Sequence, residues 1–118
     1  MLTNKKALVV HHETGSLDDI ANNLERLGYN VVALSDTLQA IEVAGKNDFS
    51  LIVLDYTIGP GPFDGAGFMR KLAERHANPP NVIVLAKYGI GHHKFPVKTL
   101  GTIIGAFSFR QLEQLLPA

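Results

Sequence analysis

The 118-residue chain lacks cysteine and tryptophan and carries no net charge. Without cysteine there are no disulfides and no thiolate metal sites, so a cytoplasmic location is the simplest expectation. Because 11 basic residues balance 11 acidic ones, no long-range positive field exists to hold a nucleic-acid backbone or an anionic membrane. We therefore expect neither nucleic acid nor a membrane as a partner.

Long apolar runs are also missing, since no segment approaches the roughly 18 uninterrupted apolar residues of a membrane span. The first six residues run into a short apolar segment without the long hydrophobic region and cleavage site of a secretory signal. A hydrophobic content of 46% with 19% charged residues is typical of a soluble globular protein. The length suits one folding unit, so we predict a single domain over residues 1–118.

The chain does contain five short apolar runs rich in β-branched residues, which alternate with segments of helical period. The runs are continuous, as expected of strands buried on both faces of a parallel sheet. They cover Ala7 to Val10, Val31 to Leu34, Leu51 to Leu54, Val82 to Leu85 and Thr102 to Ile104. This alternation predicts an α/β fold with a doubly wound, five-stranded parallel sheet of order 2-1-3-4-5. The loops after Val10, Leu54 and Leu85 should then converge on one pocket.

Local signals mark where the intervening helices begin and end. One apolar stripe runs from Leu17 to Leu27. Ser16, with Asp19 three residues later, forms a capping box that should open this helix, and Gly28 should close it. Further helices are expected over about Leu38 to Ala44, Ala66 to His76 and Ser108 to Leu116. Their core-facing residues include Phe68, Met69 and Leu72 in the third helix and Phe109, Leu112 and Leu116 in the last.

The second helix should follow Thr37 and end before Gly45, and the last should open with a capping box at Ser108 and stop at Pro117. The segment from Tyr88 to Leu100 contains two glycines and a proline and has no clean apolar stripe. We therefore expect a short or irregular fourth helix there.

Over essentially the whole chain, the sequence resembles the receiver domains of response regulators, the CheY-like family. The matching pieces are Leu8 to Val10 before a polar triplet, Leu27-Gly28-Tyr29, Leu51 to Asp55, Asp64-Gly65 and Val82 to Leu85. The resemblance implies a flavodoxin-like fold and a role in two-component signal transduction. It also implies that Asp55 occupies the position of the aspartate that accepts a phosphoryl group from a histidine kinase.

The acidic positions of the family pattern are altered in this chain. Where receivers have two acidic residues that hold Mg²⁺ after the first strand, this sequence has His11 and His12, followed by Glu13. Magnesium prefers hard oxygen ligands, whereas a neutral imidazole offers one softer nitrogen and no charge. We therefore expect Mg²⁺ binding beside Asp55 to be weak or absent.

Two further positions of the resemblance are also degenerate. Ala86 stands where the family has a threonine or serine, which removes the hydroxyl that would bond a phosphoryl oxygen. Gly105 stands where the family has a lysine, which removes the cation that would pair with the phosphate. The phosphoacceptor position is thus retained without the groups that normally assist it.

Other ligand chemistries receive weaker support from the sequence. The pairs His11-His12 and His92-His93 should lie on neighbouring loops around Asp55, but two sequential pairs are no specific metal motif, so we expect solvent-facing histidines and no metal. Thr14-Gly15-Ser16 is a weak match to the phosphate loop of FMN-binding flavodoxins, and helix capping accounts for it adequately. We expect no cofactor.

These observations favour an atypical receiver, or pseudo-receiver, that acts as a protein-interaction module and not as an enzyme. Its partner would be a histidine kinase, a downstream signalling protein or a second copy of the chain. Phe107, Phe109 and Arg110 form the candidate interaction surface, near the face that receivers commonly use for such contacts. A working phosphoacceptor modified on Asp55 remains the alternative, and a metal- or FMN-binding flavodoxin-like protein is a remote one.

Overall fold

The computed structural model describes residues 5–11, 14–55, 65–75, 80–86, 99–104 and 109–116. Up to residue 86, strands and helices alternate along these residues, as predicted. In chain order they are β1 (Lys6–Val10), α1 (Thr14–Arg26), β2 (Asn30–Leu34), α2 (Thr37–Lys46), β3 (Leu51–Asp55), α3 (Gly65–Arg75), β4 (Asn81–Ala86), β5 (Thr99–Ile104) and α4 (Phe109–Leu115). No helix among the described residues is long and apolar enough to cross a membrane.

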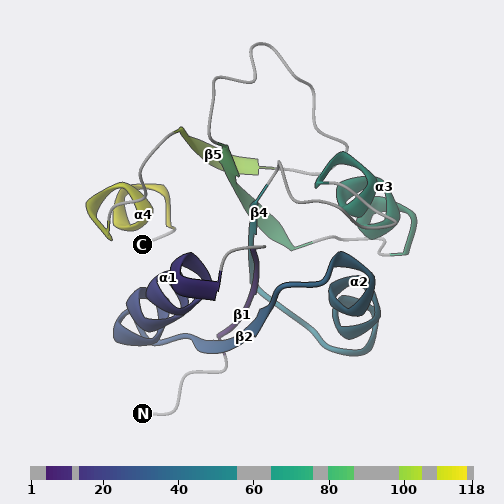
Figure 1. Cartoon of the computed structure of the whole chain (residues 1–118), viewed down its shortest axis with the longest axis horizontal. Coiled ribbons are helices and arrows are strands. Elements are labelled where there is room, and N and C mark those ends of the chain that lie inside the picture. The colour runs from purple at the N-terminus through teal and green to yellow at the C-terminus, as the bar shows by residue number, and fades with distance from the viewer. Residues whose placement is uncertain are drawn as a thin grey trace.

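The strands form one parallel sheet in the order β2-β1-β3-β4-β5, which confirms the predicted topology. The crossover helices cover both faces of this sheet (Figure 1): α1 and α4 lie on one face, and α2 and α3 on the other. The reversal of strand order beside β1 is the place where doubly wound sheets bind ligands, at the carboxyl ends of the strands.

Two hydrophobic cores result, one on each face of the sheet, because successive side chains of a strand point to opposite faces. Leu8 and Val10 of β1 join the core that includes α2 and α3, whereas Ala7 and Val9 join the core that includes α1 and α4. The same alternation holds in β3 and β4, which explains why these runs are apolar throughout. The prediction of burial on both faces is wrong for β2, which is largely exposed because it forms an edge of the sheet.

Helix α1 begins earlier than predicted. Thr14 is its first residue, so Ser16 lies inside the helix and the predicted capping box is wrong. A Cβ at Gly15 would meet no heavy atom within 4 Å. The helix extends two residues further toward β1 than the capping residue Ser16 predicts, because a residue of capping type alone does not fix the boundary.

The end of α1 follows the prediction, with Gly28 as the terminating residue. Its φ of 97° lies in the left-handed region. The Tyr29 N–H donates to the carbonyl of Leu24 at 3.1 Å, and the Gly28 N–H donates to that of Glu25 at 3.0 Å. These are the two bonds of a Schellman motif, and Leu24 and Tyr29 also share the core under α1 and α4.

Helix α2 departs from the predicted limits at both ends. Its N-cap is Asp36, whose Oδ1 accepts a hydrogen bond from the Leu38 N–H at 3.0 Å. The carboxylate of Asp36, and not the hydroxyl of Thr37, therefore caps the helix, and Thr37 is a buried residue of its first turn. Gly45 lies inside the last turn and does not end the helix, which continues to Lys46.

Strand β5 begins three residues earlier than predicted. The predicted strand begins at Thr102, whereas Thr99, Leu100 and Gly101 also belong to β5. The glycine permits close packing, since a Cβ at this position would lie 2.5 Å from Leu115 Cδ2 of α4. The pairing with β4 shifts register between Val82 and Ile83. The predicted fourth helix falls outside the described residues, apart from Thr99 and Leu100.

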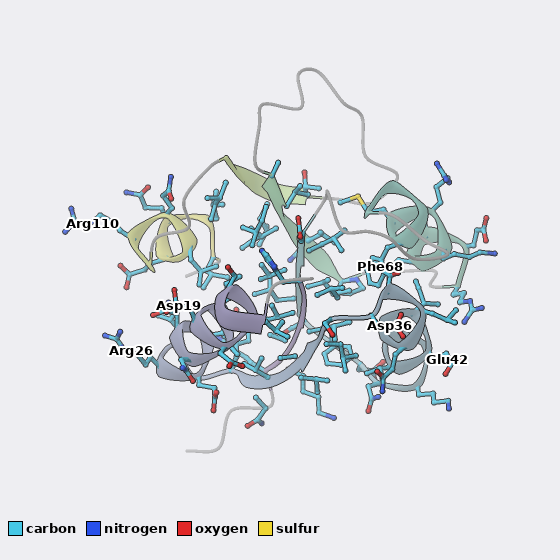
Figure 2. All side chains as sticks on the ribbon, viewed as in Figure 1. Asp19, Arg26, Asp36, Glu42, Phe68 and Arg110 are labelled. Carbon is cyan, nitrogen blue, oxygen red and sulfur yellow. The ribbon has the colours of Figure 1, made fainter. Side chains whose placement is uncertain are left out.

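The inward faces of the last two helices match the predictions where they are described. Phe68, Met69 and Leu72 of α3 are fully buried, and Phe68 lies between α3 and the sheet (Figure 2). Leu112 of α4 is fully buried, and Leu116, just beyond the helix, is half-buried. Ser108, Pro117, His76 and the side chain of Phe109 lie outside the described residues.

Candidate functional site

Asp55 is the last residue of β3, at the carboxyl edge of the sheet. The register pairs Val10 with Leu54 and Asp55 with Leu85, so the ends of β1, β3 and β4 meet at one level, as predicted. Asp55 is only 3% exposed, and Thr37 is the only other buried polar residue among those described. An ionised carboxylate in such a place requires polar or charged partners, because its burial without them is costly.

His11 is the described residue that supplies one such partner. Its Nδ1 lies 3.7 Å from Asp55 Oδ2, and the side chains are 13% and 4% exposed, respectively. This separation is longer than a hydrogen bond but within ion-pair range when the imidazole is protonated. The prediction of solvent-facing histidines is therefore wrong for His11.

The backbone explains why these two side chains meet. The His11 N–H donates to the carbonyl of Leu34 at 3.2 Å, so the β1–β2 ladder extends one residue beyond β1. Side chains alternate along a strand, which directs His11 to the same face as Val9. By the same alternation Asp55 shares the face of Val53, and both Val9 and Val53 belong to the core under α1 and α4.

Ala86, the last residue of β4, borders the site on the other side. It lies one residue beyond Leu85, the partner of Asp55, pairs with Ile104 and is 4% exposed. A methyl group there neither donates nor accepts a hydrogen bond. The side chain at this position, where the family resemblance implies a hydroxyl, therefore adds an apolar wall and no polar group.

The described residues do not supply the donor set that Mg²⁺ prefers. They contain no group of three or more histidine, cysteine, aspartate or glutamate side chains placed to hold a metal ion. Among the described residues at this edge of the sheet, an imidazole accompanies the Asp55 carboxylate. Magnesium prefers near-octahedral oxygen coordination, which these two side chains alone do not supply.

Several predicted site residues fall outside the described parts of the chain. These are His12, Glu13, Gly105 and Phe107, together with His92 and His93. Phe109 is the first residue of α4, although its side chain is not described. Arg110 is exposed and points away from the sheet on the outer side of α4 (Figure 2), so it belongs to the surface and not to the Asp55 site.

The pairing of His11 with Asp55 is the feature that sequence reasoning missed. The signal was present, because His11 follows β1 directly and Asp55 ends the neighbouring β3. Side chains two residues apart on a strand share a face, so His11 lies on the face of Val9 and Asp55 on the face of Val53. Because Val9 and Val53 are neighbours on adjacent strands, this rule would have placed both site side chains on one face.

The chain is similar to a curated regulator and to several solved structures. It is 34% identical over 103 residues to the alkaline phosphatase synthesis transcriptional regulatory protein PhoP of Bacillus subtilis. That match covers 87% of this chain but only 40% of PhoP, so the chain spans less than half the length of this relative. No protein-family model matches the chain.

The structural similarity is stronger than the sequence similarity. A CheY-like receiver domain of a response regulator from Methylobacillus flagellatus superposes with a TM-score of 0.82, at 12% identity, over 96% of each chain. The receiver domain of the sensor histidine kinase PA1611 from Pseudomonas aeruginosa, solved with magnesium in its active-site cleft, gives a TM-score of 0.80 at 19% identity. That match covers 96% of this chain and 94% of the other.

Proposed function

Because this chain is a CheY-like receiver domain of the response-regulator type, we propose that it serves two-component signalling as a pseudo-receiver. In this role it binds a signalling protein through a permanently presented surface, and Mg²⁺-dependent phosphorylation of Asp55 is impaired or absent. The partner is a histidine kinase or a downstream protein of such a pathway.

The observation that carries this proposal is the contact between His11 and Asp55. Attack of a carboxylate on a phosphoryl donor brings two negative groups together, and a bound cation normally offsets their repulsion. In this chain an imidazole lies 3.7 Å from the Asp55 carboxylate, where the family resemblance implies a metal-binding acid. A neutral imidazole provides little of the required charge, and a protonated one already forms an ion pair with the carboxylate.

The second supporting observation is the methyl group of Ala86. A phosphoryl group shifts a two-state equilibrium only as far as it interacts better with one state than with the other. The Ala86 side chain contributes no hydrogen bond to such an oxyanion. A phosphoryl group on Asp55 would therefore gain no side-chain hydrogen bond on this side of the site, and we expect little change of conformational state to follow.

Incubation with acetyl phosphate and Mg²⁺, followed by intact-protein mass spectrometry, tests the proposal. In a working receiver, an Asp55 oxygen forms a bond to phosphorus, the bond from phosphorus to the acetate oxygen breaks, and acetate leaves. We expect no gain of a phosphoryl group by the wild type or by Asp55→Asn. A receiver domain that phosphorylates under the same conditions serves as the positive control.

The alternative function, a working phosphoacceptor, is favoured by one observation. Asp55 retains the place at the end of β3, between β1 and β4, that the phosphoacceptor of the family would occupy. A phosphoryl gain in the wild type that is lost in Asp55→Asn would establish this alternative and refute the pseudo-receiver.

A further inference from the structure

Strand β2 forms one edge of the sheet and lacks the features that usually prevent edge strands from pairing. Its sequence, Asn-Val-Val-Ala-Leu, contains no charged residue and no proline, and its register with β1 is continuous over five residues. Natural edge strands are commonly interrupted by lysine, proline or a bulge. The opposite edge, β5, has such an irregularity in its pairing with β4. Figure 1 shows β2 at the end of the sheet, between α1 and α2.

The backbone of β2 offers hydrogen-bonding groups on its outer side. Its first residue, Asn30, donates its N–H to the Lys5 carbonyl at 2.8 Å, and the carbonyl of Leu34, its last residue, accepts from the His11 N–H at 3.2 Å. In a parallel ladder, alternate residues direct both backbone groups to the same neighbour. Val31 and Ala33 therefore direct their N–H and C=O groups away from β1, where no other strand of the described sheet lies.

These outward groups are self-complementary about a two-fold axis. If a second β2 approaches in the antiparallel direction, Val31 of each copy pairs with Ala33 of the other, which gives four hydrogen bonds between the strands. Val32 then lies directly opposite Val32 of the second copy, in the position where side chains approach most closely. Val32 is 39% exposed and is one of two exposed large hydrophobic residues in the described part of the chain.

Charge also suits two antiparallel copies. The exposed Lys6, on the neighbouring β1, pairs with Asn30 near one end of β2, and the exposed Asp36 follows Leu34 at the other end. An antiparallel arrangement brings the basic end of each copy next to the acidic end of the other. The chain has no net charge, so no overall repulsion opposes its association with itself.

We propose that β2 pairs with β2 of a second copy of this chain, in an antiparallel register centred on Val32, so that two sheets become one. The inference is independent of the signalling role, because it involves neither Asp55 nor α4. The contact between two five-residue strands is small, and the dimer is accordingly weak and dependent on protein concentration.

Sedimentation equilibrium of the 118-residue chain over a wide concentration range tests this proposal. We expect the wild type to dimerise and both Val32→Lys and Ala33→Pro to weaken the association by about tenfold or more. Val32→Lys places two like charges opposite each other, and Ala33→Pro removes an outward N–H without removing a bond to β1. Leu38→Lys is the matched control, because Leu38 is the other exposed large hydrophobic residue and lies on α2.

Amide hydrogen exchange tests the same proposal on the wild type alone, so its result does not depend on whether a variant folds. The Val31 and Ala33 amides should exchange more slowly as the protein concentration rises, whereas the Val32 amide, which faces β1, should change little. A wild type that remains monomeric, association unaffected by both β2 substitutions, or association lost only in Leu38→Lys would each overturn the proposal.

Discussion

At the scale of single residues, the contact between His11 and Asp55 bears on whether this site can bind Mg²⁺. We expect one carboxylate beside one imidazole to bind Mg²⁺ weakly, because the ion prefers several hard oxygen ligands. We expect the wild type to show no saturable shift of backbone NMR signals around Asp55 at low millimolar Mg²⁺. His11→Asp adds a second carboxylate at this place and should raise the affinity for the ion.

His11→Asn controls for this change, since it removes the imidazole without adding a charge. It should leave Mg²⁺ binding as weak as in the wild type. Saturation by the wild type itself, centred on Asp55 and His11, would contradict the expectation and would favour the working phosphoacceptor.

Tyr29 provides a second prediction for a single residue. Burial raises the pKa of its phenol above the ordinary value of 10.0. The folded chain therefore retains this proton at a pH where the unfolded chain loses it, and the stability that depends on it is present below pH 10 and lost as the pH rises through the folded pKa.

Urea unfolding below and above pH 10 should show this loss. In Tyr29→Phe the decrease in unfolding free energy between the two pH values should be smaller than in the wild type, because the phenol no longer titrates. Equal decreases in the two proteins would show that the Tyr29 phenol does not contribute to the alkaline loss.

At the scale of single elements, a glycine that follows α1 and a glycine within α2 should respond to alanine in opposite directions. Gly28 has a φ of 97°, so Gly28→Ala should lower the unfolding free energy by about 1–2 kcal/mol. Gly45 lies within α2, and a Cβ there would meet no heavy atom within 4 Å. Gly45→Ala should therefore raise the unfolding free energy by roughly 0.5–1 kcal/mol. Chemical denaturation measures both, and a shift of the same sign in the two variants would refute this account of the helix ends.

Sequence patterns predicted the strands of this fold better than the helix starts. Apolar runs locate strands reliably here because both faces of β1, β3 and β4 are buried. Residues of capping type are common, so Ser16 and Thr37 were plausible starts, and only the backbone reveals that Asp36 caps α2. The early start of β5 was missed because Gly101 interrupts the apolar pattern, and its packing against Leu115 depends on tertiary contact.

The candidate site was predictable in its location but not in its internal contacts. The ends of β1, β3 and β4 converge as the topology requires, which placed Asp55 and Ala86 correctly at this edge. The distance between His11 and Asp55 depends on side-chain direction and on one further ladder bond after β1. Neither the composition nor a sequence motif predicts the hydrogen bond from the His11 N–H to the Leu34 carbonyl.

At the scale of the whole molecule, the Asp55 site and the surface of α4 should be separable. Pull-down from host extract with the wild type would identify the signalling partner, and binding of that purified partner can then be measured. We expect Asp55→Asn to bind nearly as tightly as the wild type, whereas substitutions on the exposed face of α4 and β5 should weaken binding. Arg110→Ala represents this surface because Arg110 is exposed there.

Circular dichroism verifies that both variants fold before their affinities are compared. Glu42→Ala on α2 is a suitable control, because Glu42 is exposed on a helix that covers the opposite face of the sheet. Loss of partner binding in Asp55→Asn with full binding by Arg110→Ala would mean that the acidic site governs recognition.

The order of the strands has a consequence for how the chain assembles. β1 lies between β2 and β3, and all three strands belong to the first 55 residues, so one edge of the sheet and the two strands beside it come first in the chain. β4 then adds beside β3, and β5 beside β4, one strand at a time toward a single edge. During synthesis, β2, β1 and β3, which are adjacent in the sheet, therefore leave the ribosome before β4 and β5 do. Asp55 is the last residue of these three strands, and β4, which borders the site on the other side, follows later in the chain.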